Sequence, residues 1–311
     1  MRHLKFWLIA LSCGLAGSVA HAEPAALARI SVTIPTLSAQ QTPMLAAEAQ
    51  HDDPELRSRA FMVVDQLTGR VLLSRNANEV VPIASLTKIM TAMVVLDRQQ
   101  SLKETINIGY QDVDTLRHSR SRLPVGTRIT REEALHLALM ASENRAASAL
   151  ARHYPGGTRA FVKAMNAKAR LLGLGNTYFA ESTGLSAGNV STARDLARMV
   201  VAAARYPLIR EFSTGTDYTV DVANGGLREF RNTNGLVRDP DWRIGLSKTG
   251  YIKEAGRCLV MQAWLKGRPL AVVLLDSTGK YTRTADAQRL RKWLAERHWD
   301  QTLARADRIK G

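Results

Sequence analysis

Short apolar runs bounded by polar or glycine residues occur near both ends of the chain and predict β-strands there. Near the N-terminus, the runs 59–65 and 70–75 predict two strands, and Gly69 can take the positive φ that a hairpin turn between them needs. Towards the C-terminus, three further runs predict strands at 243–249, 257–265 and 269–276. Both ends of the chain are therefore expected to contribute strands.

The middle of the chain has the three-to-four-residue apolar period of amphipathic helices. Thr130 stands three residues before Glu133, which is the spacing of a capping box and predicts a helix start. Thr192, with Asp195 three residues on, predicts another. The predicted helices are 85–96, 130–140, 158–172, 192–205 and a closing helix from 284 to about 298.

The order of these elements is a strand hairpin, a helical middle, three strands and a final helix. A doubly wound parallel sheet would alternate strand and helix along the chain, and this sequence does not. The sequence therefore predicts an α+β fold, in which one antiparallel sheet built from both chain ends packs against a central helical block.

The first 22 residues have the pattern of a secretory signal peptide. A basic start precedes an apolar run that is too short to span a membrane comfortably, and Ala20-His21-Ala22 supplies a cleavage site. Cys13 would suggest a lipoprotein signal, but Ala10 stands three residues before it, where leucine is usual. The expected divisions of the chain are a signal peptide 1–22, a flexible leader 23–56, a domain 57–300 and a tail 301–311.

The chain carries a formal net charge of +15, from 43 Lys and Arg against 28 Asp and Glu. Loss of Arg2 and Lys5 with the signal peptide, which holds no acidic residue, leaves +13. Such an excess favours an anionic partner: nucleic acid, anionic lipid or an acidic polymer. Export argues against nucleic acid, so a carboxylate-rich cell-wall polymer fits better. No later apolar run is long enough for an integral membrane anchor.

Two residues of types that often carry chemistry have simpler interpretations. Cys258 is the only cysteine left after cleavage, so it forms no internal disulfide, and its apolar neighbours predict a buried strand position. His136 lies in an apolar helix and is expected to be a satisfied core residue rather than a catalyst. With no His-x-x-x-His or cysteine pair in the sequence, no metal or cofactor is expected.

Ser85 and Lys88 stand three residues apart at a predicted helix start, so their side chains share one face. A serine hydroxyl becomes a nucleophile when a base takes its proton, and a lysine held neutral can be that base. The apolar neighbours Ile83 and Leu86 favour the burial that lowers a lysine pKa. The simpler alternative is that Ser85 caps the helix and Lys88 is a surface charge. Ser277-Thr278-Gly279-Lys280 matches the same pattern, so the pattern alone decides little.

Two further motifs could complete a site around this pair. Ser142 and Asn144 follow a predicted helix, where a hydroxyl could pass a proton and an amide could hold a carbonyl. Lys248-Thr249-Gly250 lies on a predicted strand, where the cation and the hydroxyl could hold a carboxylate and the glycine would let a peptide approach closely. The simpler alternatives are a helix cap at Ser142 and a polar edge strand. Ser74-Arg75-Asn76 also matches Ser-x-Asn by chance.

The ordered set Ser85, Ser142 and Lys248 resembles the Ser-x-x-Lys, Ser-x-Asn and Lys-Thr-Gly motifs of the penicillin-recognising serine peptidases and serine β-lactamases. Within this group, the chain from about Arg59 to Trp293 is similar to the low-molecular-mass penicillin-binding proteins, in particular the D-alanyl-D-alanine endopeptidases among them. The segments that carry this resemblance are PIASLTKIMTAMVVLD (82–97), LALMASENRAASALARHYPGG (137–157), STGLS (182–186), FRNTNGLV (230–237) and SKTGYIKEAGRCLVM (247–261).

The resemblance implies the penicillin-binding protein and serine β-lactamase fold and a role for each matching residue. Ser85 is expected to be the acylated nucleophile, Lys88 its base, and Ser142 a proton relay towards the leaving amine. The backbone N–H groups of Ser85 and Tyr251 are expected to form the oxyanion hole. The residues expected to bind substrate are Asn144, Lys248, Thr249 and Gly250.

The same resemblance implies a periplasmic serine D,D-endopeptidase that cleaves D-alanyl-diaminopimelate crosslinks in peptidoglycan. Its expected partners are peptidoglycan muropeptides and, as acylating inhibitors, β-lactam antibiotics. The chain ends soon after its closing helix, where related carboxypeptidases add a second domain and a membrane anchor, which favours the endopeptidase. Near Glu181 it also lacks the Glu-x-x-Leu-Asn segment that class A β-lactamases use for deacylation.

Three alternatives remain open: a D-alanyl-D-alanine carboxypeptidase, a non-catalytic β-lactam sensor and a murein-binding scaffold. The carboxypeptidase would use the same chemical residues. The sensor would keep acylation of Ser85 without turning over peptide, and the scaffold is favoured by the basic charge alone. An adduct seen after penicillin treatment would dismiss the scaffold, and turnover of muropeptides would dismiss the sensor.

Overall fold

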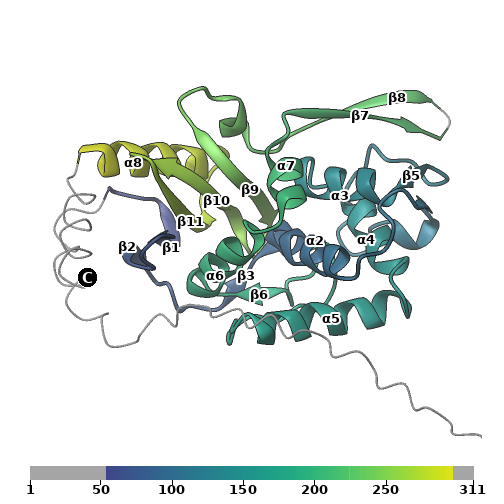
Figure 1. The fold of residues 1–311 in the computed structure, drawn as a ribbon, viewed down its shortest axis with the longest axis horizontal. Coiled ribbons are helices and arrows are strands. Elements are labelled where there is room, and N and C mark those ends of the chain that lie inside the picture. Colours follow the sequence, from purple (N-terminus) through teal and green to yellow (C-terminus); the bar gives the residue numbers. More distant parts are fainter. Residues whose placement is uncertain (1–53, 224, 297–311) are drawn as a thin grey trace, which may run out of the picture. The chain divides into compact units, whose positions relative to one another are not determined.

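The computed structural model describes residues 54–223 and 225–296 of the chain (Figure 1). The predicted signal peptide, the leader up to residue 53 and the predicted tail 301–311 lie outside these residues. In the part of the chain that is described, no helix is both long enough and apolar enough to cross a membrane.

A five-stranded antiparallel sheet lies at the centre of the fold, in the order β2-β1-β11-β10-β9. Its strands are β1 (Ser58–Asp65), β2 (Val71–Arg75), β9 (Arg243–Ile252), β10 (Gly256–Leu265) and β11 (Arg268–Ser277). The N-terminal hairpin joins the C-terminal strands through the β1–β11 pair, in which Phe61 lies opposite Leu274. The predicted antiparallel sheet from both chain ends is therefore confirmed. Because β9 is an edge strand, alternate backbone N–H and C=O groups of it point away from the sheet.

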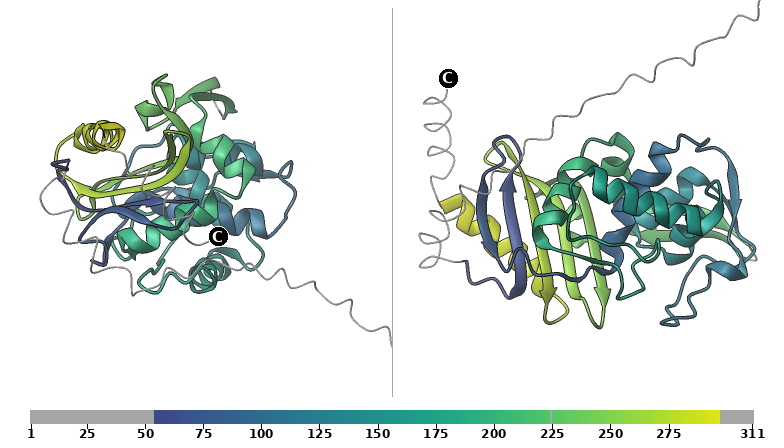
Figure 2. Two further views of the ribbon diagram at one scale, coloured as in Figure 1. Left: turned by 60° about the vertical axis from the view of Figure 1, so that its left-hand side comes forward. Right: turned by 90° about the horizontal axis from the view of Figure 1, so that it is seen from below.

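Both faces of the sheet are covered, because successive strand residues point alternately to opposite sides. On one face lies α8 (Thr282–Glu296), whose Leu290 and Leu294 pack on the sheet (Figure 2). On the other face, Met62 and Val260 pack with the helical block. The predicted closing helix is thus the cover of one face, and the helical middle of the chain covers the other.

Two helices of the helical block begin at the capping residues that the sequence predicts. Thr130 and Glu133 form the predicted capping box: Glu133 N donates to Thr130 Oγ1 at 3.1 Å, and Thr130 N donates to Glu133 Oε2 at 2.6 Å. Thr192 Oγ1 accepts from Asp195 N at 3.1 Å in the same way. The helices of the block are α2 (Thr87–Asp97), α3 (Arg131–Met140), α4 (Asn144–Arg152), α5 (Gly157–Leu171), α6 (Ala193–Ala203) and α7 (Pro207–Thr214).

Several elements were not predicted from the sequence. Helix α7 follows α6 after a short turn and begins with Pro207, so the two apolar patterns merge in the sequence. The alternation of Tyr218, Val220 and Val222 was a usable signal for the first strand of a hairpin. The unpredicted strands are β3 (Val81–Pro82), β4 (Thr105–Asn107), β5 (Arg128–Thr130), β6 (Val190–Ser191), β7 (Asp217–Val222) and β8 (Gly226–Arg231). Those of two or three residues are too short to show a period.

Cys258 lies in β10 with its side chain fully buried, as predicted. Its thiol donates a hydrogen bond to the carbonyl of Ala255, with 3.3 Å between the sulfur and the oxygen. Burial raises the pKa of this thiol to about 11. The thiol is therefore protonated and unreactive at neutral pH.

Leu290→Ala is expected to lower the free energy of unfolding by about 2–5 kcal/mol, because it leaves a cavity between α8 and the sheet. Leu227 on β8 is 75% exposed, so the same change there should alter stability by less than about 0.5 kcal/mol. Denaturant unfolding followed by circular dichroism measures both variants. Equal losses for the two would show that α8 contributes little to the stability of the sheet.

Candidate active site

Ser85 lies on a sharp turn just before α2 rather than inside that helix. It is the middle residue of the short 3-10 helix η3 (Ala84–Leu86), so the predicted helix 85–96 begins later than expected. Ala84 has a φ of 48°, in the left-handed region that costs strain for a residue with a Cβ. The N-cap of α2 is Leu86, which makes no side-chain cap bond. The interpretation of Ser85 as a simple helix cap is therefore wrong.

The amino group of Lys88 is held by three oxygen atoms. Its Nζ lies 3.0 Å from Ser85 Oγ, 2.7 Å from Asn144 Oδ1 and 2.5 Å from the backbone oxygen of Thr183. Lys88 is fully buried, so these groups take the place of water. In the neutral form, its two N–H groups serve Asn144 and Thr183, and its lone pair faces the Ser85 hydroxyl. This geometry suits transfer of a proton from Ser85 to Lys88.

Burial lowers the pKa of Lys88 to about 8, against the opposing influence of the Glu181 and Glu143 carboxylates. About one molecule in ten then has a neutral Lys88 at pH 7, compared with fewer than one in a thousand for an exposed lysine. The alternative of a solvated surface charge is wrong for this residue.

Lys248 is a second buried cation, placed by β9 near Lys88. Its Nζ donates to the backbone oxygen of Thr249 at 3.0 Å. Burial lowers the pKa of Lys248 well below its usual value, and repulsion from Lys88 and Arg283 lowers it further. Because the two lysines repel each other, a proton on one favours the neutral form of the other.

Gly250 allows β9 to pack directly against the turn that carries Ser85. A Cβ at position 250 would lie 3.1 Å from the backbone oxygen of Ile83 and 3.2 Å from Ser85 N. The close approach expected of this glycine thus brings the strand to the chain's own Ser85 turn. The next residue, Tyr251, continues β9, and its side chain is largely exposed.

Thr233 joins β9 to the turn that precedes Ser142. Thr249 Oγ1 donates to Thr233 Oγ1 at 2.7 Å, and Thr233 N donates to the backbone oxygen of Met140 at 3.1 Å. Thr249 is therefore held from within the chain, and Thr233 is a site residue that the motifs do not include. Its only sequence signal was its place in the segment 230–237 that resembles the penicillin-binding proteins.

Ser142 and Asn144 lie at the junction of α3 and α4. Ser142 has a φ of 60°, a left-handed conformation that is strained for a serine. The N-cap of α4 is Glu143, so the interpretation of Ser142 as the cap is wrong. Asn144 Nδ2 donates to Ser119 Oγ at 3.1 Å, which turns Asn144 Oδ1 towards Lys88. The structure thus brings Asn144 to the Ser85–Lys88 pair.

The loop 181–189 is a further part of the site outside the three motifs, although its segment 182–186 is among those that resemble the penicillin-binding proteins. It supplies the Thr183 carbonyl that accepts from Lys88. Gly184, with a φ of 83°, packs so closely that a Cβ there would lie 2.0 Å from the backbone oxygen of Ala84. A glycine in a polar run was the available signal, because it marks a position of positive φ or close approach.

The chance matches to the motifs have structural roles away from this cluster. Ser277 Oγ shares a hydrogen bond of 2.7 Å with Ser58 Oγ at the start of β1. Lys280 lies over the ring of Tyr281, with 5.3 Å between its Nζ and the ring centroid. Ser74 lies in β2, which is at the opposite edge of the sheet from β9.

His136 packs between two aromatic rings, 4.8 Å from Phe212 and 4.1 Å from Tyr218 between centroids. Burial lowers its pKa, so the ring is neutral at pH 7. The ring is half-buried rather than fully within the core, and the expectation of satisfied hydrogen bonding is not met. Its buried Nε2 has no hydrogen-bond partner among the described residues.

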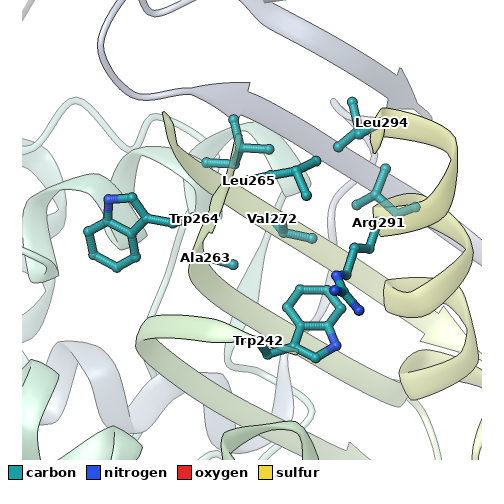
Figure 3. A pocket seen from close by; sticks show the side chains of 9 residues that line it. Trp242, Ala263, Trp264, Leu265, Val272, Arg291 and Leu294 are labelled. Atoms are coloured by element: carbon teal, nitrogen blue, oxygen red, sulfur yellow. The ribbon is translucent and has the colours of Figure 1, made fainter. Parts of the chain in front are cut away.

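A small cavity lies on the face of the sheet that α8 covers, between β10, β11 and α8 (Figure 3). Its volume of about 20 Å³ leaves room for roughly one water molecule. Among the residues that line it, the Arg291 guanidinium lies 5.7 Å from the centre of the Trp242 ring. Because this cavity is too small for a peptide, it is not an alternative to the cluster at β9 as the candidate site.

Comparison with known proteins gives relatives over most of the chain. The profile of a family described as D-alanyl-D-alanine carboxypeptidase matches residues 46–279. The D-alanyl-D-alanine endopeptidases of Pseudomonas aeruginosa and Escherichia coli are 53% and 47% identical to the chain, over 77% and 80% of its length and 78% and 81% of theirs. The carboxypeptidase DacF of Bacillus subtilis is 35% identical over 79% of this chain and 63% of that protein.

A solved structure with the same fold is the DD-transpeptidase of Streptomyces K15. It superposes with a TM-score of 0.71 at 30% identity, and the match covers 76% of this chain and 97% of that one. This likeness confirms the fold that the motif set implied.

Gly184→Ala is expected to lower the free energy of unfolding by roughly 2 kcal/mol or more, because a side chain there is strained and meets Ala84. The matched control is Gly175→Ala, since a Cβ at that exposed position meets nothing within 4 Å. The control should change stability by less than about 0.5 kcal/mol. Denaturant unfolding of the two variants tests this. If Gly184→Ala were as stable as Gly175→Ala, the Ser85 turn would have moved to accommodate the added methyl group at little cost in free energy.

Proposed function

The chain belongs to the family of serine-type D-alanyl-D-alanine peptidases, and we propose that it is a D,D-endopeptidase acting on peptidoglycan through an acyl-enzyme on Ser85. The observation that carries this proposal is the 3.0 Å hydrogen bond between Lys88 Nζ and Ser85 Oγ, because it joins a nucleophile to a buried amine. The choice of endopeptidase over carboxypeptidase is supported by the relatives near half identity, which are endopeptidases.

In the proposed acylation, Ser85 Oγ attacks the carbonyl carbon of a D-alanine while its proton passes to neutral Lys88. The backbone N–H groups of Ser85 and Tyr251 stabilise the negative charge on the carbonyl oxygen. The bond from carbon to the leaving nitrogen then breaks, and the proton held by Lys88 passes through Ser142 to the leaving amine, which leaves Lys88 neutral. For a crosslink, this amine belongs to the diaminopimelate of the neighbouring strand.

Hydrolysis of the ester completes the proposed reaction. A water molecule attacks the acyl carbon and gives one proton to Lys88. The bond between the acyl carbon and Ser85 Oγ breaks, and Ser85 recovers a proton from Lys88. The products are a D-alanine carboxylate on the donor strand and a free amine on the neighbouring strand.

The edge strand β9 is the proposed place for the peptide. An extended peptide can bind an edge strand through its backbone groups. Asn144 then holds a backbone amide, and Lys248, Thr249 and Gly250 orient the peptide beside Ser85. The net charge of +15 suits an anionic polymer. The signal-peptide pattern of residues 1–22 supports a periplasmic site of action, and a β-lactam would acylate Ser85 because it presents a strained amide to the same site.

Purified protein is expected to release monomers from muropeptide dimers crosslinked through D-alanyl-diaminopimelate, with little free D-alanine from pentapeptide monomers. Chromatography with mass spectrometry identifies the products. Ser85→Ala should abolish cleavage and penicillin labelling while leaving thermal unfolding unchanged, since one half-buried hydroxyl contributes little to stability.

Each alternative gives a different result in this assay. Rapid release of D-alanine with intact dimers would make the protein a carboxypeptidase. A stable penicillin adduct without turnover of either substrate would make it a sensor. Absence of any adduct would leave the scaffold.

Acylation by a labelled penicillin is expected to rise with pH and to level off above about pH 8, because Lys88 accepts a proton only in its neutral form. Lys88→Arg should lose about a hundredfold or more in rate at every pH, since arginine stays protonated. The matched control is Lys163→Arg on the exposed surface of α5, which should not change the rate. A Lys88→Arg variant that keeps most of the rate would exclude Lys88 as the base.

A further inference from the structure

Glu181 organises the loop that holds Lys88, although it lies outside the three motifs. We propose that Glu181 is a positioning residue of the peptidase reaction, whose carboxylate folds the turn 181–186 so that the Thr183 carbonyl accepts from Lys88. The inference rests on the proposed function, because it assigns Glu181 to the reaction of Ser85 and Lys88.

The Glu181 carboxylate is surrounded by donors from its own loop. Its Oε2 accepts from both the backbone nitrogen and the hydroxyl of Thr183, each at 2.5 Å. Its Oε1 accepts from Gly184 N at 2.6 Å, from Asn189 Nδ2 at 3.0 Å and from Ser186 N at 3.4 Å. A carboxylate has two oxygens that only accept, whereas a carboxamide would turn an NH₂ group towards some of these donors. The turn therefore depends on a carboxylate at this position.

The loop is also fastened to α2 beside Lys88. Thr91, three residues after Lys88 on the same face of α2, donates from Oγ1 to the backbone oxygen of Ser182 at 2.7 Å. The backbone oxygen of the next residue, Thr183, accepts from Lys88 at 2.5 Å. The backbone carbonyls of Ser182 and Thr183 thus both accept from side chains of α2. The backbone N–H groups of Thr183 and Gly184 donate to the Glu181 carboxylate.

Asn189 ties the far end of this loop to both sides of the Ser85 turn. Its backbone oxygen accepts from Ile83 N at 3.0 Å, and its Nδ2 donates to Thr87 Oγ1 at 2.9 Å. The same Nδ2 lies 3.0 Å from Glu181 Oε1. A change at Glu181 is therefore transmitted to the segment that carries Ser85 as well as to Lys88.

Charged groups around Lys88 decide the pH at which its amine is neutral. Glu181 in the loop and Glu143 before α4 raise the pKa of Lys88 and oppose the larger effect of burial. Lys248 on β9 repels Lys88, and Arg283 of α8 in turn repels Lys248. Removal of the Glu181 charge therefore lowers the pKa of Lys88, and the neutral base then forms at lower pH.

A positioning role and a merely structural role predict different pH profiles for acylation. If Glu181 only stabilised the fold, its loss would reduce the fraction of protein that can be labelled, and the rate constant of the folded fraction would match wild type at every pH. If Glu181 positions Lys88, its loss changes both the plateau rate and the midpoint of the profile.

The test is the rate constant for acylation by a labelled penicillin, measured on full-length proteins between about pH 5 and pH 10. Glu181→Gln is expected to move the midpoint about one pH unit to lower pH and to reduce the plateau roughly ten- to a hundredfold. Glu181→Asp keeps the charge, so its midpoint should match wild type. Its plateau rate should lie between those of wild type and Glu181→Gln. The matched control is Glu132→Gln, on the exposed side of α3, which should behave as wild type.

An unchanged midpoint in Glu181→Gln, or a midpoint at higher pH, would overturn the assignment. If circular dichroism shows that Glu181→Gln does not fold, Glu181→Asp decides: a lower plateau with an unmoved midpoint supports the assignment, and a wild-type plateau refutes it. A wild-type protein that takes up no penicillin would refute the proposed function itself, so the two failures are distinguishable.

Discussion

Lys88 and Lys248 are buried near each other where the edge of the sheet meets the helical block. Two ammonium groups in such a place lack water and repel each other, so each favours the neutral form of the other. Oxygen atoms that accept hydrogen bonds from an ammonium group replace the lost water and stabilise its charged form. The protein supplies three oxygen acceptors to Lys88, and the charges of Glu181 and Glu143 lie close enough to raise its pKa. The Ser85 turn, the start of α4 and the loop after α5 are the elements that bring these groups together.

The sheet and most of the helices could be predicted because their signals are local. Apolar runs predicted the strands, and the capping residues Thr130 and Thr192 predicted two helix starts. The pair Ser85 and Lys88 could be predicted because a three-residue spacing places two side chains on one side of a turn. The proton relay at Ser142 and the oxyanion hole stay predictions.

The contacts that complete the site could not be predicted in this way. The Thr183 carbonyl is 95 residues from Lys88 in the sequence, and any residue type carries such a carbonyl. The strained turn at Ala84 depends on the close packing of Gly184 and Gly250, which only the tertiary structure shows. Thr233 also acts through contacts that are distant in sequence. Sequence patterns therefore give the pair Ser85 and Lys88 and miss much of what holds it in place.

The position of β9 has a consequence beyond the reaction. No further strand among the described residues pairs with β9, so the sheet keeps an edge on which a strand of another copy could add. Proteins commonly prevent such association with positive charges along an edge strand. Arg243, at the exposed start of β9, carries such a charge, and the whole chain has a net charge of +15. The basic character of the chain thus opposes the approach of a second copy to this edge.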